Sequence, residues 1–403
     1  MKINNNKLEF NIIKNYIFIF LSRLDLTQGI WMIYFATKGM DLTKLGILEG
    51  IFHLVSFSME VPTGVIADLW GRRVSRILGR LLAMISMLLL IFSNDFYMFA
   101  LSFTILAISY NLESGAGDAL LYDSLKVLGR EEEYVKINGK NEMFMQIGSV
   151  AALVLGGYLG SKDYYLAFLV SAIIAGITFI QSFTFVEPAD TLKSVRVVKY
   201  ETVKKTNLLL SQIIDSINII KGNKKVGFLI ILINIVSILA TSMFYYLQNF
   251  WKTQGNSEFT IGIYLSISSL LAGFMATKVY KLKELLKEKG IMISIPIIIA
   301  LSIWGIVITS GAQVFYAIIC IADSIAYVII SDYINKLIPS KNRATILSFQ
   351  SMVFSFFMIL LFPLIGKLGD CFSLNFSFII MAIIASLLSV LNVYVLTTKF
   401  RSI

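Results

Sequence analysis

The chain has 403 residues, of which 57% are hydrophobic and 15% are charged. This composition excludes a soluble globular domain and is typical of a protein with many membrane-spanning segments. The net charge of +10 would suit a nucleic-acid partner. However, the basic residues are spread over the loops between apolar segments, so we expect no nucleic-acid binding.

Apolar segments long enough to cross a bilayer, about twenty residues each, recur along the whole chain. The apolar runs are continuous and not alternating, so they predict helices and not barrel strands. We therefore predict an all-α membrane protein with twelve transmembrane helices. The predicted spans are 12–37, 43–66, 74–94, 96–116, 141–160, 164–185, 226–250, 259–277, 290–309, 312–335, 344–366 and 373–397.

The positions of lysine and arginine orient these spans. If the N-terminus is cytoplasmic, most basic residues fall on the cytoplasmic side, with Arg76 and Arg80 in end turns beside it, and Arg23 alone lies deep within a span. This pattern follows the positive-inside rule, so we expect a multi-pass protein of the cell membrane with both termini in the cytoplasm. The basic residues left on the outer side are Lys38, Lys44, Lys162, Lys252 and Lys367.

One long polar interval divides the chain. We predict an N-terminal half (1–185), a cytoplasmic linker (186–225) and a C-terminal half (226–403), with six spans in each half. A faint repeat relates the halves. The pattern Gly64-x-x-Ala-Asp68 recurs as Gly273-x-x-Ala-Thr277, and Asp123 recurs as Asp332 at the same offset of 209 residues. A shared offset favours a duplication and two pseudo-symmetric halves.

The loop between the second and third spans carries a specific motif. Its residues Gly64, Asp68, Gly71, Arg72 and Arg73 all match G-x-x-x-D-x-x-G-R-[RK]. This resembles the cytoplasmic loop motif of the major facilitator superfamily, and the resemblance to the family covers nearly the full length of the chain. The resemblance implies a secondary transporter, built as a twelve-helix bundle of two halves around a central cavity. We expect a monomer in the lipid bilayer.

The charges of this loop oppose the helix dipoles around them. Asp68 lies at the C-terminal end of one helix, while Arg72 and Arg73 begin the next. Asp123 is a natural partner for the arginines, and the N-terminus of the eleventh span, at Arg343, is a natural receptor for Asp68. We predict a latch that closes the cytoplasmic side and breaks on inward opening. The alternative is a static staple of the loop.

Charged residues within spans are costly and mark functional sites. His53, the only histidine, lies on a polar face of the second span, and a His–carboxylate pair suits proton coupling. The alternative for His53 is a packing role. Glu60 and Glu113 are the first candidates for the proton carrier because both lie in the inner half of their helices, and Asp25 and Asp323 are second. The polar face of the second span comprises Glu49, His53, Ser56 and Glu60.

In the major facilitator superfamily, helices 1, 4, 7 and 10 line the central cavity, and this implies a set of substrate residues here. Arg23 is either a substrate ligand or a structural partner of a carboxylate such as Glu113. The aromatic side chains of the set suit an apolar or cationic substrate. The predicted cavity residues are Arg23, Trp31, Tyr34, Asn111, Asp118, Tyr245 and Tyr327.

The chain resembles bacterial drug-efflux transporters but departs from them in two places. Their fourth-helix motif has arginine and glutamine where this chain has Asn111 and Ser114, and their fifth helix has a Gly-Pro motif that is missing here. We predict proton-coupled efflux of small amphipathic organic compounds by an antiporter. The alternatives are a transporter of a polar metabolite, such as a sugar or peptide, and a lipid flippase.

An enzymatic function is not predicted. The sequence contains no nucleophile elbow and no phosphate-binding loop, and Cys320 and Cys371 form no ligand cluster. We therefore expect no catalytic residues, no metal and no cofactor. The expected partners are protons and a small-molecule substrate.

Overall fold

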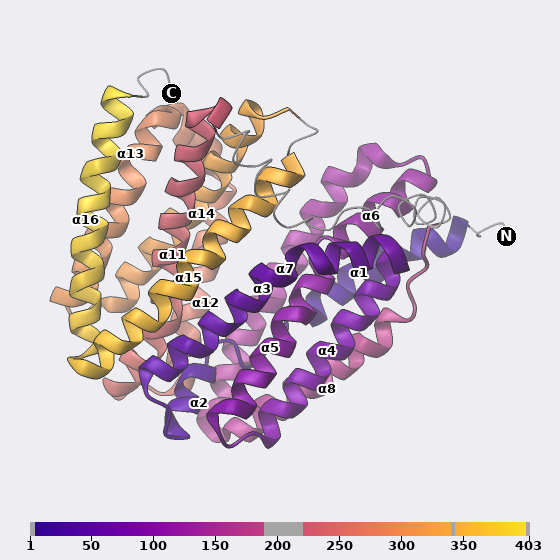
Figure 1. Ribbon diagram of the computed structural model, residues 1–403, viewed down its shortest axis with the longest axis horizontal. Helices are drawn as coiled ribbons and strands as arrows, with labels where there is room; N and C mark the ends of the chain where they lie inside the picture. Colours follow the sequence, from indigo (N-terminus) through magenta and orange to yellow (C-terminus); the bar gives the residue numbers. More distant parts are fainter. Residues whose placement is uncertain (1–4, 189–220, 340–342, 400–403) are drawn as a thin grey trace. The chain divides into compact units, whose positions relative to one another are not determined.

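The computed structural model describes residues 5–188, 221–339 and 343–399, which form helices without any strand (Figure 1). Eleven helices in these residues are long and apolar enough to cross a membrane. Most of the predicted linker lies outside the described residues, so the division of the chain at the linker stays a prediction.

The chain forms two compact units. The first comprises Met1–Ile30 and Ile51–Leu209, and the second comprises Trp31–Gly50 and Leu210–Ile403. The boundary near the N-terminus falls inside a continuous helix, α3 (Leu42–Trp70). The N-terminal end of α3 therefore packs with the second unit, although the rest of the helix belongs to the first.

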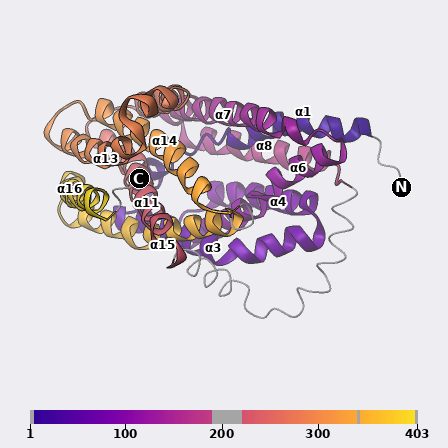
Figure 2. The ribbon, with the colours of Figure 1, turned by 90° about the horizontal axis from the view of Figure 1, so that it is seen from above.

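Besides its part of α3, the first unit contains α1 (Asn5–Arg23), α4 (Arg72–Phe92), α5 (Phe96–Glu113), α6 (Ala116–Val127), the 3₁₀ turn η1 (Glu131–Glu133), α7 (Tyr134–Lys162) and α8 (Tyr164–Ser182). Besides its part of α3, the second unit contains α2 (Trp31–Thr37), α11 (Lys224–Thr253), α12 (Glu258–Ala276), α13 (Val279–Ile308), α14 (Ala312–Leu337), α15 (Arg343–Cys371) and α16 (Leu374–Thr398). In the first unit α4 packs against α5 and α8, and in the second α13 packs against α14 and α16 (Figures 1 and 2).

Short polar residues start several helices. The side chains of Asp95, Asp163, Ser257 and Ser373 each accept a hydrogen bond from a backbone N–H in the first turn of the helix that follows. Such caps satisfy backbone donors that have no partner within the helix. They explain why the predicted starts near residues 96, 164, 259 and 373 agree closely with the structure.

Two of the predicted spans are interrupted. The first consists of α1 and α2, separated by residues 24–30, where the Asp25 carboxylate accepts hydrogen bonds from Thr27 N and Oγ1 at 3.0 and 2.7 Å. Such local bonds compete with the helix. The fourth span breaks between α5 and α6 at Gly115, which has a φ of 70°. The predicted first span is therefore not one unbroken helix, whereas the break in the fourth lies at the end of its predicted range.

Candidate functional site

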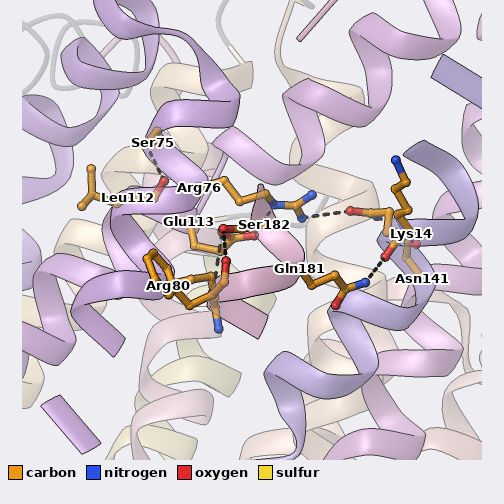
Figure 3. Close-up of polar contacts among 11 residues, drawn as sticks. Lys14, Ser75, Arg76, Arg80, Leu112, Glu113, Asn141, Gln181 and Ser182 are labelled. Atoms are coloured by element: carbon orange, nitrogen blue, oxygen red, sulfur yellow. Dashed lines mark hydrogen bonds and ion pairs between the residues drawn. The ribbon is translucent and has the colours of Figure 1, made fainter. Parts of the chain in front are cut away.

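A cluster of charges lies inside the first unit, where α4 faces α5. Arg76 and Arg80 lie one turn apart on α4, and both contact Glu113, the last residue of α5 (Figure 3). Arg76 Nε donates to Glu113 Oε1 at 2.8 Å, and Arg80 Nε lies 3.8 Å from Glu113 Oε2. One carboxylate therefore faces two guanidinium groups.

Arg76 is almost completely enclosed. Its side chain is 2% exposed, and its guanidinium carbon lies 4.1 Å from the centre of the Phe18 ring and 4.5 Å from that of Phe185. Its Nη2 donates to Asn15 Oδ1 at 2.9 Å. Aromatic faces and a paired carboxylate are the surroundings that make a buried arginine tolerable. Removing the carboxylate would leave a buried, unpaired charge, a change that typically costs about 3–5 kcal/mol.

The cluster is not saturated with hydrogen bonds. Arg76 Nη1 and Glu113 Oε2 are buried atoms without a hydrogen-bond partner among the described residues. The ion pairs of Glu113 with Arg76 and Arg80 therefore join the end of α5 to α4.

These contacts correct one expectation about arginine. Arg76 lies near the start of α4, as expected, but it is buried there, and Glu113 is paired with Arg76 and Arg80 and not with Arg23. Arg23 is exposed at the last turn of α1. The pairing was not foreseen because Arg76 and Arg80 lie only one and two turns from the start of α4, where a basic residue is expected from the positive-inside rule alone. The i, i+4 spacing of the two arginines was the available signal.

The other predicted residues of the first unit have varied surroundings. Asn111 is 5% exposed and exchanges two hydrogen bonds with Ser56, accepting from Oγ at 2.7 Å and donating to the backbone oxygen at 2.6 Å, so it joins α5 to α3. His53 is buried on α3 against the edge of Phe52, and Glu60 is half-buried. Asp118 is exposed in the first turn of α6, where a carboxylate is favoured by the helix dipole.

In the second unit the structure brings two predicted aromatic residues together. The Trp31 ring lies 5.5 Å from that of Tyr245, which in turn lies 5.6 Å from Phe362. Tyr34 lies beneath the ammonium group of Lys38 at 5.5 Å. Tyr327 is 58% exposed on α14.

Asp323 has different surroundings from Glu113. Its Oδ1 accepts a hydrogen bond from Ser237 Oγ at 2.8 Å, which joins α14 to α11. Among the described residues Asp323 makes no ion pair with a lysine or arginine side chain. The two units therefore each place a carboxylate between helices, one beside arginines and one beside a hydroxyl.

The loop between α3 and α4 is held by two carboxylates. Arg72 forms an ion pair with Asp123, as the dipole argument predicted. Glu187, which follows α8, accepts hydrogen bonds from Arg72 N at 3.1 Å and Arg73 N at 2.6 Å. Arg73 Nη2 also donates to Phe183 O at 2.8 Å. The first turn of α4 is thereby capped by a side chain more than 100 residues away in the sequence.

Glu187 is the residue of this loop cluster that sequence reasoning missed. Partial burial raises the pKa of its carboxyl group above the ordinary value, while the two backbone N–H donors and Arg72 oppose that shift. A carboxylate that binds backbone donors leaves no pattern in the sequence. The only signal was its position just after an apolar span.

The remaining part of the predicted latch has no observed partner. Asp68 is exposed, and it forms neither a hydrogen bond nor an ion pair with the described residues. The side chain of Arg343 lies outside the described part of the chain, so its expected role remains a prediction. Gly64 lies in α3, and no described atom is within 4 Å of the position that a Cβ would occupy there.

The described residues contain no group of three or more His, Cys, Asp or Glu side chains that could hold a metal ion. Cys320 is partly buried on α14, and Cys371 is exposed at the end of α15.

Comparison with known proteins identifies related chains. The sequence pattern of the Major Facilitator Superfamily matches residues 16–331. YxaM of Bacillus subtilis (strain 168), an uncharacterized MFS-type transporter, is 25% identical over 391 residues, covering 92% of each chain.

Solved structures with the same fold include two transporters. The nucleoside transporter NupG has a TM-score of 0.75 at 15% identity, covering 97% of this chain and 98% of its own. A D-xylose-proton symporter has a TM-score of 0.71 at 13% identity and covers 96% of each chain. At these identities the likeness concerns the fold alone.

Proposed function

Because this chain belongs to the Major Facilitator Superfamily, we propose that it is a proton-coupled antiporter that exports small amphipathic organic molecules. It is a multi-pass membrane transporter of the all-α MFS fold. The proposal adds three properties to this: coupling to protons, export as the direction of transport, and the class of substrate. The distribution of lysine and arginine supports cytoplasmic termini and a cell-membrane location.

The observation that carries the proposal is Glu113 between Arg76 and Arg80. When Glu113 is ionised, it holds both arginines near α5, and when it is protonated it releases at least one of them. The free arginine must then find another partner or become hydrated, so α4 and α5 repack. A buried carboxylate whose protonation changes helix packing is the element that a proton-driven cycle needs.

Asp323 is the second candidate for the proton carrier. It lies between two helices and accepts a hydrogen bond from the neutral hydroxyl group of Ser237, so protonation breaks no ion pair there. Asp25, Glu60 and His53 remain further candidates. A substrate with an apolar ring is supported by the aromatic group of Trp31, Tyr245 and Phe362.

Transport in proteoliposomes with an imposed pH gradient tests whether transport is coupled to protons. Glu113→Gln should abolish accumulation of substrate against its gradient but keep substrate exchange, and Glu132→Gln, an exposed carboxylate after α6, is the matched control. If the Glu113→Gln variant accumulates substrate at the wild-type rate, Glu113 is not the carrier. If wild-type transport ignores the pH gradient, the antiporter proposal is wrong.

A second candidate function is transport of a polar metabolite. On α11 the Ser242 hydroxyl oxygen and the Asn249 amide nitrogen are buried without a hydrogen-bond partner among the described residues. Buried donors of this kind suit a substrate with hydroxyl or amide groups. Asn249→Ala should raise KM for a polar substrate several-fold and leave transport of an amphipathic cation unchanged. The opposite result favours the amphipathic class.

A further inference from the structure

The N-terminal end of α3 is held by a carboxylate from a distant helix. Asp370, near the end of α15, accepts hydrogen bonds from Leu42 N at 2.9 Å, Thr43 N at 2.7 Å and Thr43 Oγ1 at 2.5 Å. The Asp41 side chain, in contrast, caps Lys44 N at 2.7 Å within the same turn. Two carboxylates therefore share the free N–H groups of one helix start, and only Asp370 joins that start to another helix.

Glycines bring the two helices together beside this cap. A Cβ on Gly46 would lie 2.8 Å from Phe362 O, and a Cβ on Gly366 would collide with Leu42 O. The Tyr246 hydroxyl donates to Phe362 O at 2.6 Å in the same contact. Gly46 and Gly50 have the G-x-x-x-G spacing that allows close helix approach in membranes. The contact is built for close packing, although its polar cap is exposed.

The position of this contact in the chain determines how it must respond when the two repeats move. Residues 31–50 pack with the second unit, but α3 continues without interruption into the first unit. In a transporter that works by alternating access, the two repeats move against each other. Any such movement must either bend α3 or detach residues 31–50 from α15 and α11.

We infer that Asp370 is a releasable lock, which fastens the start of α3 to α15 in one transport state and lets go when the two repeats open at that end. This inference rests on the family membership and not on proton coupling. It mirrors the predicted latch at the other end of the same two helices, where Asp68 at the end of α3 is expected to meet the start of α15. The two carboxylates would hold opposite ends in alternate states.

A reversible cross-link tests whether the contact must open. Thr43→Cys and Asp370→Cys are combined in a chain with Cys320→Ser and Cys371→Ser. Oxidation should stop transport, and a reductant should restore it to the rate of the unoxidised sample. If the cross-linked protein transports at that rate, the contact is static and the inference is wrong. Restored activity excludes misfolding as the cause of the arrest.

A second experiment measures the lock directly. Spin labels at Lys38 and Phe372, both exposed, report the separation between residues 31–50 and the end of α15. Asp370→Ala should raise the ratio of long to short distances about fivefold, as expected for the loss of a helix cap. Asp41→Ala is the matched control because it removes a cap from the same helix start without separating two helices. Equal distributions in the two variants would overturn the inference.

Discussion

Two loops related by the internal repeat are held in different ways. In the first unit, Gly71 joins α3 to α4, and Glu187 binds the first two backbone N–H groups of α4. In the second unit, Lys278 stands before α13, whose start has no side-chain cap. Among the described residues, a side chain from elsewhere in the unit therefore caps α4, while none caps α13.

The paired aspartates show the same contrast. Asp123 binds Arg72, and both side chains are at least three-quarters buried. Asp332, at the equivalent position, binds Lys283 at 3.2 Å and Lys336 at 2.6 Å, and these three side chains are 36–55% exposed. Exposed ion pairs contribute about 0–1 kcal/mol, whereas partly buried hydrogen bonds to charged groups contribute more. Both units therefore have an ion-paired aspartate at this position, but only the pair in the first unit is largely buried.

The largest effect is expected at Gly71. Its φ of 98° and ψ of 153° lie in a region open almost only to glycine, and a Cβ would lie 3.3 Å from the Glu187 carboxyl carbon. Gly71→Ala should lower stability by about 1–3 kcal/mol, visible as a lower apparent Tm in detergent. Gly64→Ala, within helix α3, is the control and should not destabilise. Equal Tm values for the Gly71→Ala variant and the wild type would contradict this account of the loop.

Removing the two aspartates compares the loops directly. Asp123→Asn should cost about 1.5 kcal/mol because Arg72 loses its partner in a largely buried site. Asp332→Asn should change stability by less than about 0.5 kcal/mol because its lysines are exposed. Thermal unfolding of both variants measures the difference. Similar losses would mean that the exposed ion pairs of Asp332 stabilise the protein as much as the buried pair of Asp123.

The Glu187 cap should make stability depend on pH. Its folded-state pKa is raised, so the folded protein binds the proton more tightly than the unfolded chain does. The contribution of Glu187 is therefore greatest below its ordinary pKa of 4.5 and is lost as pH rises through the raised value. Unfolding of the wild type and Glu187→Gln should be compared from pH 4.5 to 8. The wild type should lose more stability over this range, and parallel curves would exclude the effect.

The smallest effect is expected at Thr277, the residue equivalent to Asp68. Its hydroxyl group donates to Phe274 O at 2.8 Å on an exposed helix end. Thr277→Ala should change the free energy of unfolding by less than about 0.5 kcal/mol. The transport rate of this variant should stay close to that of the wild type. Asp68→Asn in parallel should slow transport if the predicted latch exists. If Thr277→Ala slowed transport as much as Asp68→Asn, the contrast between the loops would not concern function.

The sequence by itself determined the membrane class, most helix positions and the pairing of Arg72 with Asp123. Each of these follows from local rules: apolar length predicts a span, and helix dipoles predict which charges need a partner. The shared offset of Asp123 and Asp332 also identified equivalent positions, and both residues proved to be in ion pairs.

Only the tertiary structure decided which helices exchange charges. Arg76 and Glu113 are 37 residues apart, and no local rule indicates that α4 and α5 bring them together inside the unit. Glu187 and Asp370 bind backbone N–H groups, which every residue except proline possesses, so their partners leave no mark in the sequence. The breaks at residues 24–30 and at Gly115 interrupt continuous apolar runs, whose hydropathy reports burial but not backbone direction.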